Sequence, residues 1–111
     1  MPWLVREGDV LAALEVAETH RARLVGLLGR DGYDGALLLR PSRSVHTVGM
    51  RFPIDVAYCR RDAGGLLVLE TTCMARWRLG LPRVRARCVI EAEAGAFERW
   101  GLHAGDVVEV K

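Results

Sequence analysis

The chain has 111 residues, half of them hydrophobic, and a formal net charge of +2. This length predicts one domain, residues 1–111, and the apolar content favours a folded core over a disordered chain. The small net charge gives no reason to expect a nucleic-acid or membrane partner. Fifteen of the sixteen basic residues are arginine, which a GC-rich genome explains, so arginine content alone does not predict a phosphate site.

Charged residues interrupt the N-terminal MPWLVREGDV, so we expect no export signal. No apolar run of about 18 residues, the length that spans a bilayer, is present. The cysteines are Cys59, Cys73 and Cys88, an odd number in apolar stretches without metal-ligand spacing. We expect all three to be buried, reduced thiols, which is typical of a cytoplasmic protein.

The first elements are a strand and a short helix. DVLAALEVAE, residues 9–18, fits either a strand or a helix, and we predict a strand. THRARLVGLLGR, residues 19–30, is predicted to be the helix, with Thr19 as its N-cap. Gly29 is a candidate for the residue that ends it.

The middle of the chain predicts a series of short strands. Turn residues precede a buried strand at 36–40, and Pro41 ends that strand. A second strand is predicted at 44–48 and a third at 54–60. After a Gly-rich hairpin loop, residues 66–74 form the returning strand.

The last third contains a loop, two strands and a helical turn. Gly80 and Pro82 predict that residues 75–85 form a surface loop. Residues 86–94 are predicted to be a strand and residues 95–101 a short helix. In the closing LHAGDVVEV, Asp106 is expected to cap a turn before a final strand.

This order predicts a mainly β (α+β) fold. Hairpin-like spacings favour antiparallel pairing, and the frequent Gly and Pro turns favour a compact β-sandwich or partly closed barrel with one or two short helices. The alternative is an open α+β sheet with both helices on one face.

HTVGMRFPIDV, residues 46–56, places Asp55 inside an apolar strand. A buried carboxylate needs a partner, because an unpaired charge there costs several kcal/mol. If the chain reverses between the strands at 44–48 and 54–60, His46 faces Asp55 across the ladder. Asp55 then either holds the turn at 50–53 in place or lines a polar pocket with His46 and Arg51.

RWRLGLPRVRAR, residues 76–87, has five arginines near Trp77. A tryptophan beside arginines is suited to a planar ligand or a protein surface. The same pattern also fits a solvated loop with Trp77 packed beneath it. The ligand-binding hypothesis is a shallow cleft in which Trp77 and Arg78 cover His46, Arg51 and Asp55.

We predict no catalytic residues, no metal ligands and no cofactor. His20, His46 and His103 are scattered, and no CxxC, HxxxH, P-loop, dinucleotide fingerprint or hydrolase elbow occurs.

Motifs along nearly the whole chain, from about residue 10 to 111, resemble the domain of unknown function 192 family. RLVGLLGR resembles its first helix, HTVGMRFPIDVAYCRRDAGGLLV its central block, RWR its short loop and RCVIEAEAGAFERWGLHAGDVVEV its closing segment. The matched positions are Gly26, Gly29, Arg30, Met50, Arg51, Pro53, Asp55, Trp77, Arg78, Glu91, Gly95, Gly101, Gly105 and Asp106.

The resemblance implies a mainly antiparallel β-sandwich or barrel with one or two short helices, and no established enzymatic activity. The chain departs from the family pattern at Leu28, where methionine is usual, and at Gly49, where many members have tryptophan. Ala75 and Arg76 stand where proline is common before Trp77, and we do not expect the export signal that many members carry.

Three functions follow as hypotheses. The first is a binding module for a polar small molecule or a peptide in the cleft formed by residues 46–55 and 76–87. The second is an accessory protein that acts through a protein–protein interface at residues 76–87. The third is a hydrolase or lyase that uses His46 and Asp55.

Overall fold

The computed structural model describes residues 2–111. The elements in this range are β1 Trp3–Arg6, β2 Asp9–Ala17, α1 His20–Val25, β3 Ala36–Leu39, β4 Ile54–Asp62, β5 Gly65–Met74, β6 Cys88–Glu93, α2 Ala96–Trp100 and β7 Val107–Val110. None of the helices in this range is both long enough and apolar enough to cross a membrane.

The strands form a closed barrel with the order β1-β2-β3-β6-β4-β5-β7, and β7 pairs with β1 to complete it. The pairings are antiparallel apart from β2 and β3, which are parallel and are connected through α1. The prediction of a β-rich fold with one or two short helices is confirmed, and the structure has two in the described residues. The barrel is closed, so the sandwich and the open sheet are wrong.

β1 is the element that the sequence pattern does not predict. Its four residues pair with β2 on one side and with β7 on the other, and Leu4 lies opposite both Ala12 and Val110. Trp3 and Lys111 also exchange backbone hydrogen bonds of 2.6 and 2.9 Å. Closure removes the free sheet edges that would otherwise be exposed to aggregation.

Strand alternation creates two apolar cores on opposite faces of β3, β6 and β4. In β3, Leu38 packs inside the barrel, while Leu37 and Leu39 pack in a second core outside it. The outer core also contains Leu27, which follows α1, and Phe52 from the loop before β4. The period of two along each strand thus divides the apolar residues between the two cores.

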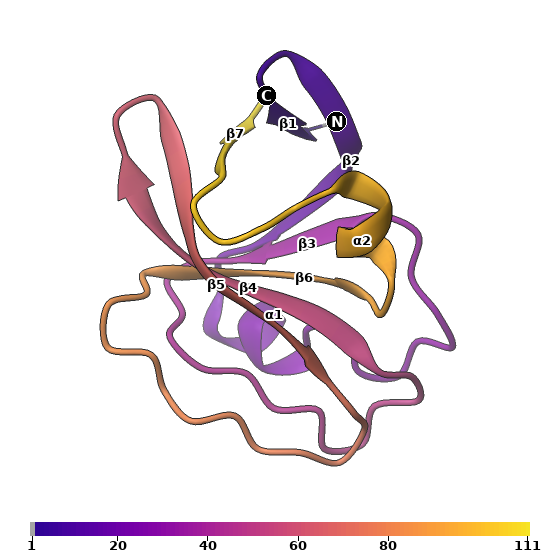
Figure 1. The fold of residues 1–111 in the computed structure, drawn as a ribbon. Helices are drawn as coiled ribbons and strands as arrows, with labels where there is room; N and C mark the ends of the chain where they lie inside the picture. The colour runs from indigo at the N-terminus through magenta and orange to yellow at the C-terminus, as the bar shows by residue number, and fades with distance from the viewer. Residues whose placement is uncertain (1) are drawn as a thin grey trace.

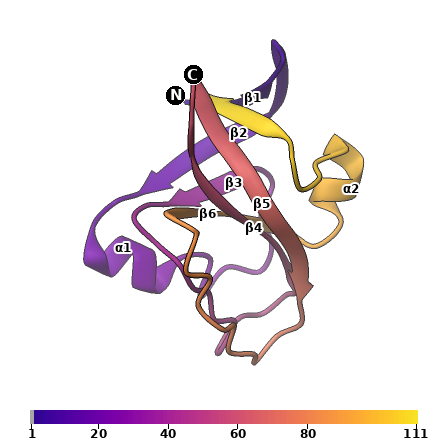
Figure 2. The same ribbon diagram turned by 60° about the vertical axis from the view of Figure 1, so that its left-hand side comes forward.

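The two helices occupy different places around this barrel (Figures 1 and 2). α2 follows β6 and contributes Ala96 and Phe97 to the core inside the barrel. α1 lies on the outer side of the β3–β6–β4 sheet, next to the long loops that run along the lower part of Figure 1. The N- and C-terminal ends lie side by side in both views.

Two predicted elements need correction. Residues 44–48 are not a strand, and their regular pairing is limited to an isolated bridge between His46 and Leu79. β4 instead pairs with β5 and β6. The helix begins after its N-cap Thr19 as predicted, but it ends at Gly26 rather than at Gly29.

The cysteine prediction is correct for Cys59 and Cys88, which are buried free thiols. It is wrong for Cys73, which is exposed. Cys73 lies in β5, whose residues are mostly half-buried, so an apolar neighbourhood in the sequence did not guarantee burial.

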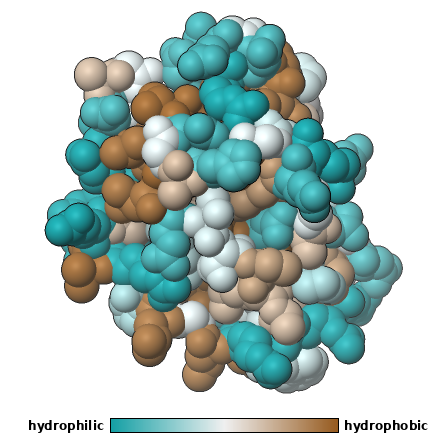
Figure 3. Space-filling view, in the orientation of Figure 1, coloured by the Kyte–Doolittle hydropathy of each residue, from teal (hydrophilic) through white to brown (hydrophobic). Residues whose placement is uncertain are grey.

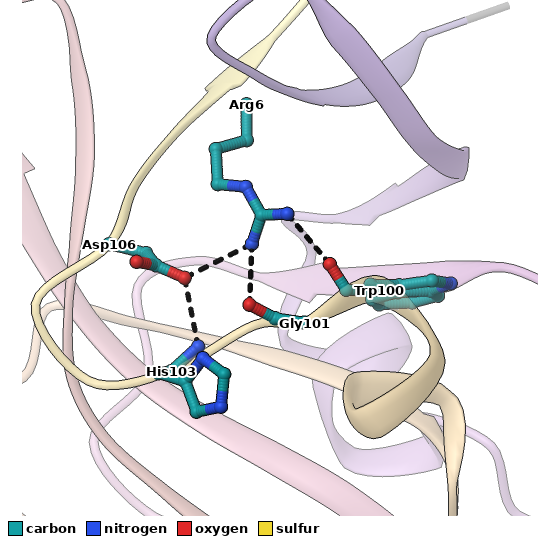
Figure 4. Close-up of polar contacts among 5 residues, drawn as sticks. All are labelled: Arg6, Trp100, Gly101, His103 and Asp106. Atoms are coloured by element: carbon teal, nitrogen blue, oxygen red, sulfur yellow. Dashed lines mark hydrogen bonds and ion pairs between the residues drawn. The ribbon is translucent and has the colours of Figure 1, made fainter.

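A polar cluster connects β1 to the segment between α2 and β7 (Figure 4). Arg6 donates hydrogen bonds to the carbonyls of Trp100 and Gly101, each at 2.7 Å, and contacts Asp106 at 3.1 Å. Asp106 also accepts a hydrogen bond from the His103 amide at 2.9 Å. The predicted turn-capping role of Asp106 is therefore confirmed.

Candidate functional site

The loops at residues 44–53 and 75–87 meet, and Thr47 joins them. Its hydroxyl donates to the Ala75 carbonyl at 2.6 Å and accepts from the Arg78 amide at 2.8 Å. The backbone amide of Thr47 donates to the Arg78 carbonyl, and the Thr47 carbonyl accepts from the Trp77 amide. Thr47 is completely buried, whereas Ala75 and Arg78 are exposed, so these bonds are partly shielded from water.

Gly80 brings the two loops into close contact further along. Its amide donates to the Val45 carbonyl at 2.8 Å. A Cβ atom at this position would lie only 2.7 Å from the Val45 oxygen and 3.3 Å from the Tyr58 hydroxyl. Any side chain here would therefore push the loops apart, which explains the glycine.

Trp77 lies on the outside of this joined pair of loops. It is 61% exposed and has a φ of +62°. A bulky side chain in the left-handed region costs about 1–2 kcal/mol, so the surrounding hydrogen bonds must hold the loop in this conformation. Leu79, Leu81 and Val84 are also exposed on the same loop. Figure 3 shows hydrophobic residues along the lower edge, where Figure 1 places the loops.

A groove of about 320 Å³ separates these loops from α1. The loops contribute Ser44, His46 and Leu79, and α1 contributes Arg23 and Leu24. The remaining lining residues are His20, Ser42, Val45 and Gly80. We call this the α1 groove. Its walls combine apolar side chains with two histidines and an arginine, as expected of a small binding site.

Glu91 lies beside a narrow cavity of about 40 Å³ that shares Arg23, Leu24 and His46 with the α1 groove. Its side chain, on β6, is buried with 4% of its surface exposed, and no hydrogen bond reaches its carboxyl group from residues 2–111. Burial raises the pKa of Glu91 to about 7. The carboxyl group can therefore donate or accept a proton near neutral pH.

The end of α1 passes directly over Glu91. Gly26 has a φ of +49°, and a Cβ atom there would lie 3.3 Å from Oε1 of Glu91. The glycine thus both permits the helix to end and leaves room for the carboxyl group.

Asp55 does not face His46, and its predicted place in the cleft is wrong. Its Oδ2 atom accepts hydrogen bonds from the amides of Gly95 at 3.0 Å and Phe97 at 3.1 Å, at the start of α2. It is therefore a buried cap for α2, on the side of β4 that faces the inside of the barrel. No hydrogen bond joins it to His46 within the described residues, so the pair that a hydrolase or lyase would need is not formed.

The other predicted site residues divide between the groove and the surface. His46 lines the α1 groove. Trp77 and Arg78 are exposed on the adjoining loop. Arg51 forms a surface ion pair with Asp31 at 2.7 Å and does not line the groove.

Sequence reasoning did not assign Thr47, Leu24 or Glu91 to the site. A glutamate inside the apolar segment RCVIEAEA was the signal for Glu91, which is also a matched family position. Thr47 and Leu24 had no such signal, because their importance comes from contacts with a distant loop. Among residues 2–111, no group of three or more His, Cys, Asp and Glu side chains is arranged to hold a metal ion.

Comparisons with known proteins identify the fold but no ligand. The model of the DUF192 family, described as "Uncharacterized ACR", matches residues 4–110. No curated protein matches the chain. A structure from Sinorhizobium meliloti 1021, described as a putative transcription regulator, superposes with a TM-score of 0.77 at 21% identity, over 98% of this chain and 91% of that one.

A second similar structure is a protein of unknown function from Novosphingobium aromaticivorans DSM 12444. It has a TM-score of 0.72 and 19% identity, and the match covers 97% of this chain and 82% of that one. At these identities the two structures establish the shared barrel fold alone.

Proposed function

Because the chain belongs to the DUF192 family, whose description names no activity, we propose a function from the geometry: a binding module that takes a peptide segment in the α1 groove. The observation that supports it most is Trp77, an exposed aromatic side chain that is held at positive φ beside the groove. Strained residues of this kind cluster at binding sites, where the surrounding structure keeps them in place.

The groove walls suggest what such a peptide would contain. Leu24 and Leu79 face the groove from opposite sides and suit an apolar side chain. Arg23 and His46 suit a polar or acidic group next to it. Exposed apolar side chains continue beyond the groove along residues 77–84 and would contact the neighbouring part of the peptide.

A random peptide library displayed on phage tests the proposal. Enriched peptides would be synthesised with a fluorescent label and titrated against the protein by anisotropy. We expect Trp77→Ala and Leu79→Ser to weaken binding by about tenfold or more, because an aromatic side chain that a partner covers often contributes over 2 kcal/mol.

The matched control is Trp3→Ala. Trp3 is also an exposed tryptophan, but it lies on β1 and does not line the groove. This variant should bind the peptides as wild type does. If no peptide is enriched, or if enriched peptides bind Trp77→Ala as tightly as wild type, the proposal fails.

A polar small molecule is the second candidate, because the groove volume of about 320 Å³ lies in the range of small-molecule sites. A thermal-shift panel of sugars, nucleotides, amino acids and organic acids would find it. A saturable shift that is lost in Leu24→Ser and kept in Trp3→Ala would favour this candidate over a peptide.

A further inference from the structure

A cavity larger than the α1 groove lies away from it and has a different chemistry. Its volume is about 810 Å³, and arginines dominate its lining. These are Arg40, Arg60, Arg61, Arg85 and Arg87, together with Glu18, Pro41, Leu66 and Cys88. We call it the arginine cavity.

The arginine cavity lies at one end of the barrel. It is formed where β2, β3 and β4 end and where β5 and β6 begin. The strand directions in the sheet bring these ends together. α2 occupies the opposite end, where Asp55 at the start of β4 accepts hydrogen bonds from it. Barrel ends are a common place for ligands.

Most of the positive charge in this cavity is not neutralised. Arg40 forms an ion pair with Glu18 at 3.1 Å. The other four arginines have no carboxylate partner within residues 2–111, and Glu18 is the one acid in the lining. The cavity therefore carries an excess of four positive charges, although the whole chain has a net charge of only +2.

The positive charge of the cavity also acts on the thiol of Cys88, which is one of the lining residues. Cys88 lies opposite Cys59 on the neighbouring strand. The hydrogen bond from Cys59 lowers the pKa of Cys88, and the charges of Arg40 and Arg61 lower it further, while burial acts in the opposite direction. An anion in the cavity would experience the same attraction.

We propose that the arginine cavity binds a small molecule that carries two or more phosphate groups. Guanidinium groups match phosphate oxygens with paired hydrogen bonds, and four unpaired arginines suit the charge of a diphosphate or triphosphate better than that of a single carboxylate. The volume accommodates a ligand of nucleotide size, and Pro41 and Leu66 provide an apolar surface for the rest of the molecule.

A bound nucleic-acid strand is less consistent with this lining. Proteins that bind single strands combine a basic path with aromatic side chains on which the bases stack. None of the residues that line this cavity is aromatic. The positive charge is also concentrated at one end of the barrel, as a compact ligand requires.

Isothermal titration calorimetry with sodium pyrophosphate tests whether the arginine cavity binds linked phosphate groups. The same titration with ATP tests a larger ligand that carries such groups. At about 0.15 M salt we expect one site per chain, a Kd below about 0.1 mM and weaker binding as salt is raised. Inorganic sulfate should bind much more weakly, because it offers a single anionic group.

The decisive comparison uses two double variants that remove equal charge. Arg61→Ala/Arg85→Ala removes two cavity arginines whose side chains make no hydrogen bond in the described structure, so it should stay folded. Arg76→Ala/Arg78→Ala removes two exposed arginines outside the cavity. We expect at least about a tenfold loss of pyrophosphate affinity in the first and less than about a twofold change in the second.

Three results would overturn the proposal. One is the absence of measurable pyrophosphate and ATP binding to folded wild-type protein. Another is an equal loss of pyrophosphate affinity in both double variants, which would show that the net charge of the protein alone attracts the ligand. The third is tight binding of a single-stranded oligonucleotide without binding of pyrophosphate. None of these results depends on the α1 groove, so the two proposals are tested separately.

Discussion

At the scale of single residues, the two buried carboxylates have opposite environments. Asp55 accepts two backbone hydrogen bonds at the start of α2, so its charge is compensated. Within residues 2–111 Glu91 has no such partners, and burial raises its pKa to about 7. In sequence both are acidic residues within apolar strands, and only their neighbours in space distinguish a helix cap from a group that titrates near neutral pH.

Replacing Asp55 with alanine should destabilise the fold. The amides of Gly95 and Phe97 would lose their acceptor in a buried place, and we expect a loss of about 1–3 kcal/mol in the free energy of unfolding. Urea denaturation of the variant and of wild type measures this loss. Asp31→Ala, which removes an exposed ion pair with Arg51, should change stability by less than about 1 kcal/mol. Equal effects of the two variants would contradict the capping role.

Glu91 should make stability fall as pH rises. Below its ordinary pKa of 4.5 the carboxyl group is protonated in both states. Between about pH 4.5 and 7 the unfolded chain releases this proton while the folded chain keeps it, so folding loses stability up to the folded pKa. The total loss is about 3 kcal/mol.

Urea denaturation across this pH range compares wild type with Glu91→Gln. The variant should gain stability relative to wild type by about 3 kcal/mol between pH 4 and pH 8. Glu93→Gln, two positions further along β6 and half-buried, is the matched control and should follow the wild-type curve. Parallel curves for wild type and Glu91→Gln would show that Glu91 does not hold a raised pKa.

At the scale of elements, two loops without regular secondary structure form an ordered unit. Thr47 connects them through its hydroxyl and its backbone, and Gly80 allows their close approach. The loop at residues 75–87 is identifiable in sequence by Gly80 and Pro82, whereas residues 44–48 are predicted to be a strand. The pairing of the two loops is not visible in sequence, because the hydrogen bonds of Thr47 join residues about 30 positions apart, with separations of 28 and 31.

Thr47→Val should disturb this unit while conserving the side-chain shape. The Ala75 carbonyl and the Arg78 amide would lose the hydroxyl as the partner in two partly buried hydrogen bonds, and we expect a loss of about 0.5–1.5 kcal/mol in the free energy of unfolding. The change is measured by urea denaturation, and by faster hydrogen exchange at Arg78. Thr47→Ser keeps the hydroxyl and should lose less stability than Thr47→Val. A Thr47→Val protein that is at least as stable as Thr47→Ser would contradict this account.

At the scale of the whole molecule, closure of the barrel depends on the two ends of the chain. β1 and β7 pair with one another, and Arg6 fixes the segment between α2 and β7 through three contacts. Strands this short are not stable alone, so each relies on the partners on both sides. The termini therefore lie next to one another as a consequence of the fold.

A circular permutant should keep this fold. A linker of about four residues can join Lys111 to the N-terminus, because Trp3 and Lys111 are already hydrogen-bonded neighbours. New ends between Asp62 and Ala63 would open the exposed β4–β5 hairpin. We expect cooperative thermal unfolding and a stability within about 2 kcal/mol of wild type.

The control permutant has the same linker and new ends between Ile90 and Glu91. This break divides β6, which lies between β3 and β4 in the barrel, and should prevent folding. If the hairpin permutant also fails to fold, closure through β1 and β7 requires more than neighbouring ends.

Local turn residues, apolar periodicity and motifs in fixed order were sufficient to predict the β-rich class, most strands, both helix starts and the family. The sequence also predicted that His46 and the Trp77 loop belong near a candidate site. Tertiary structure alone decided that the barrel closes, that Asp55 caps α2, that Glu91 lies beside the His46 cavity and that five distant arginines share one cavity. Each of these depends on contacts between segments far apart in the chain, which local patterns do not specify.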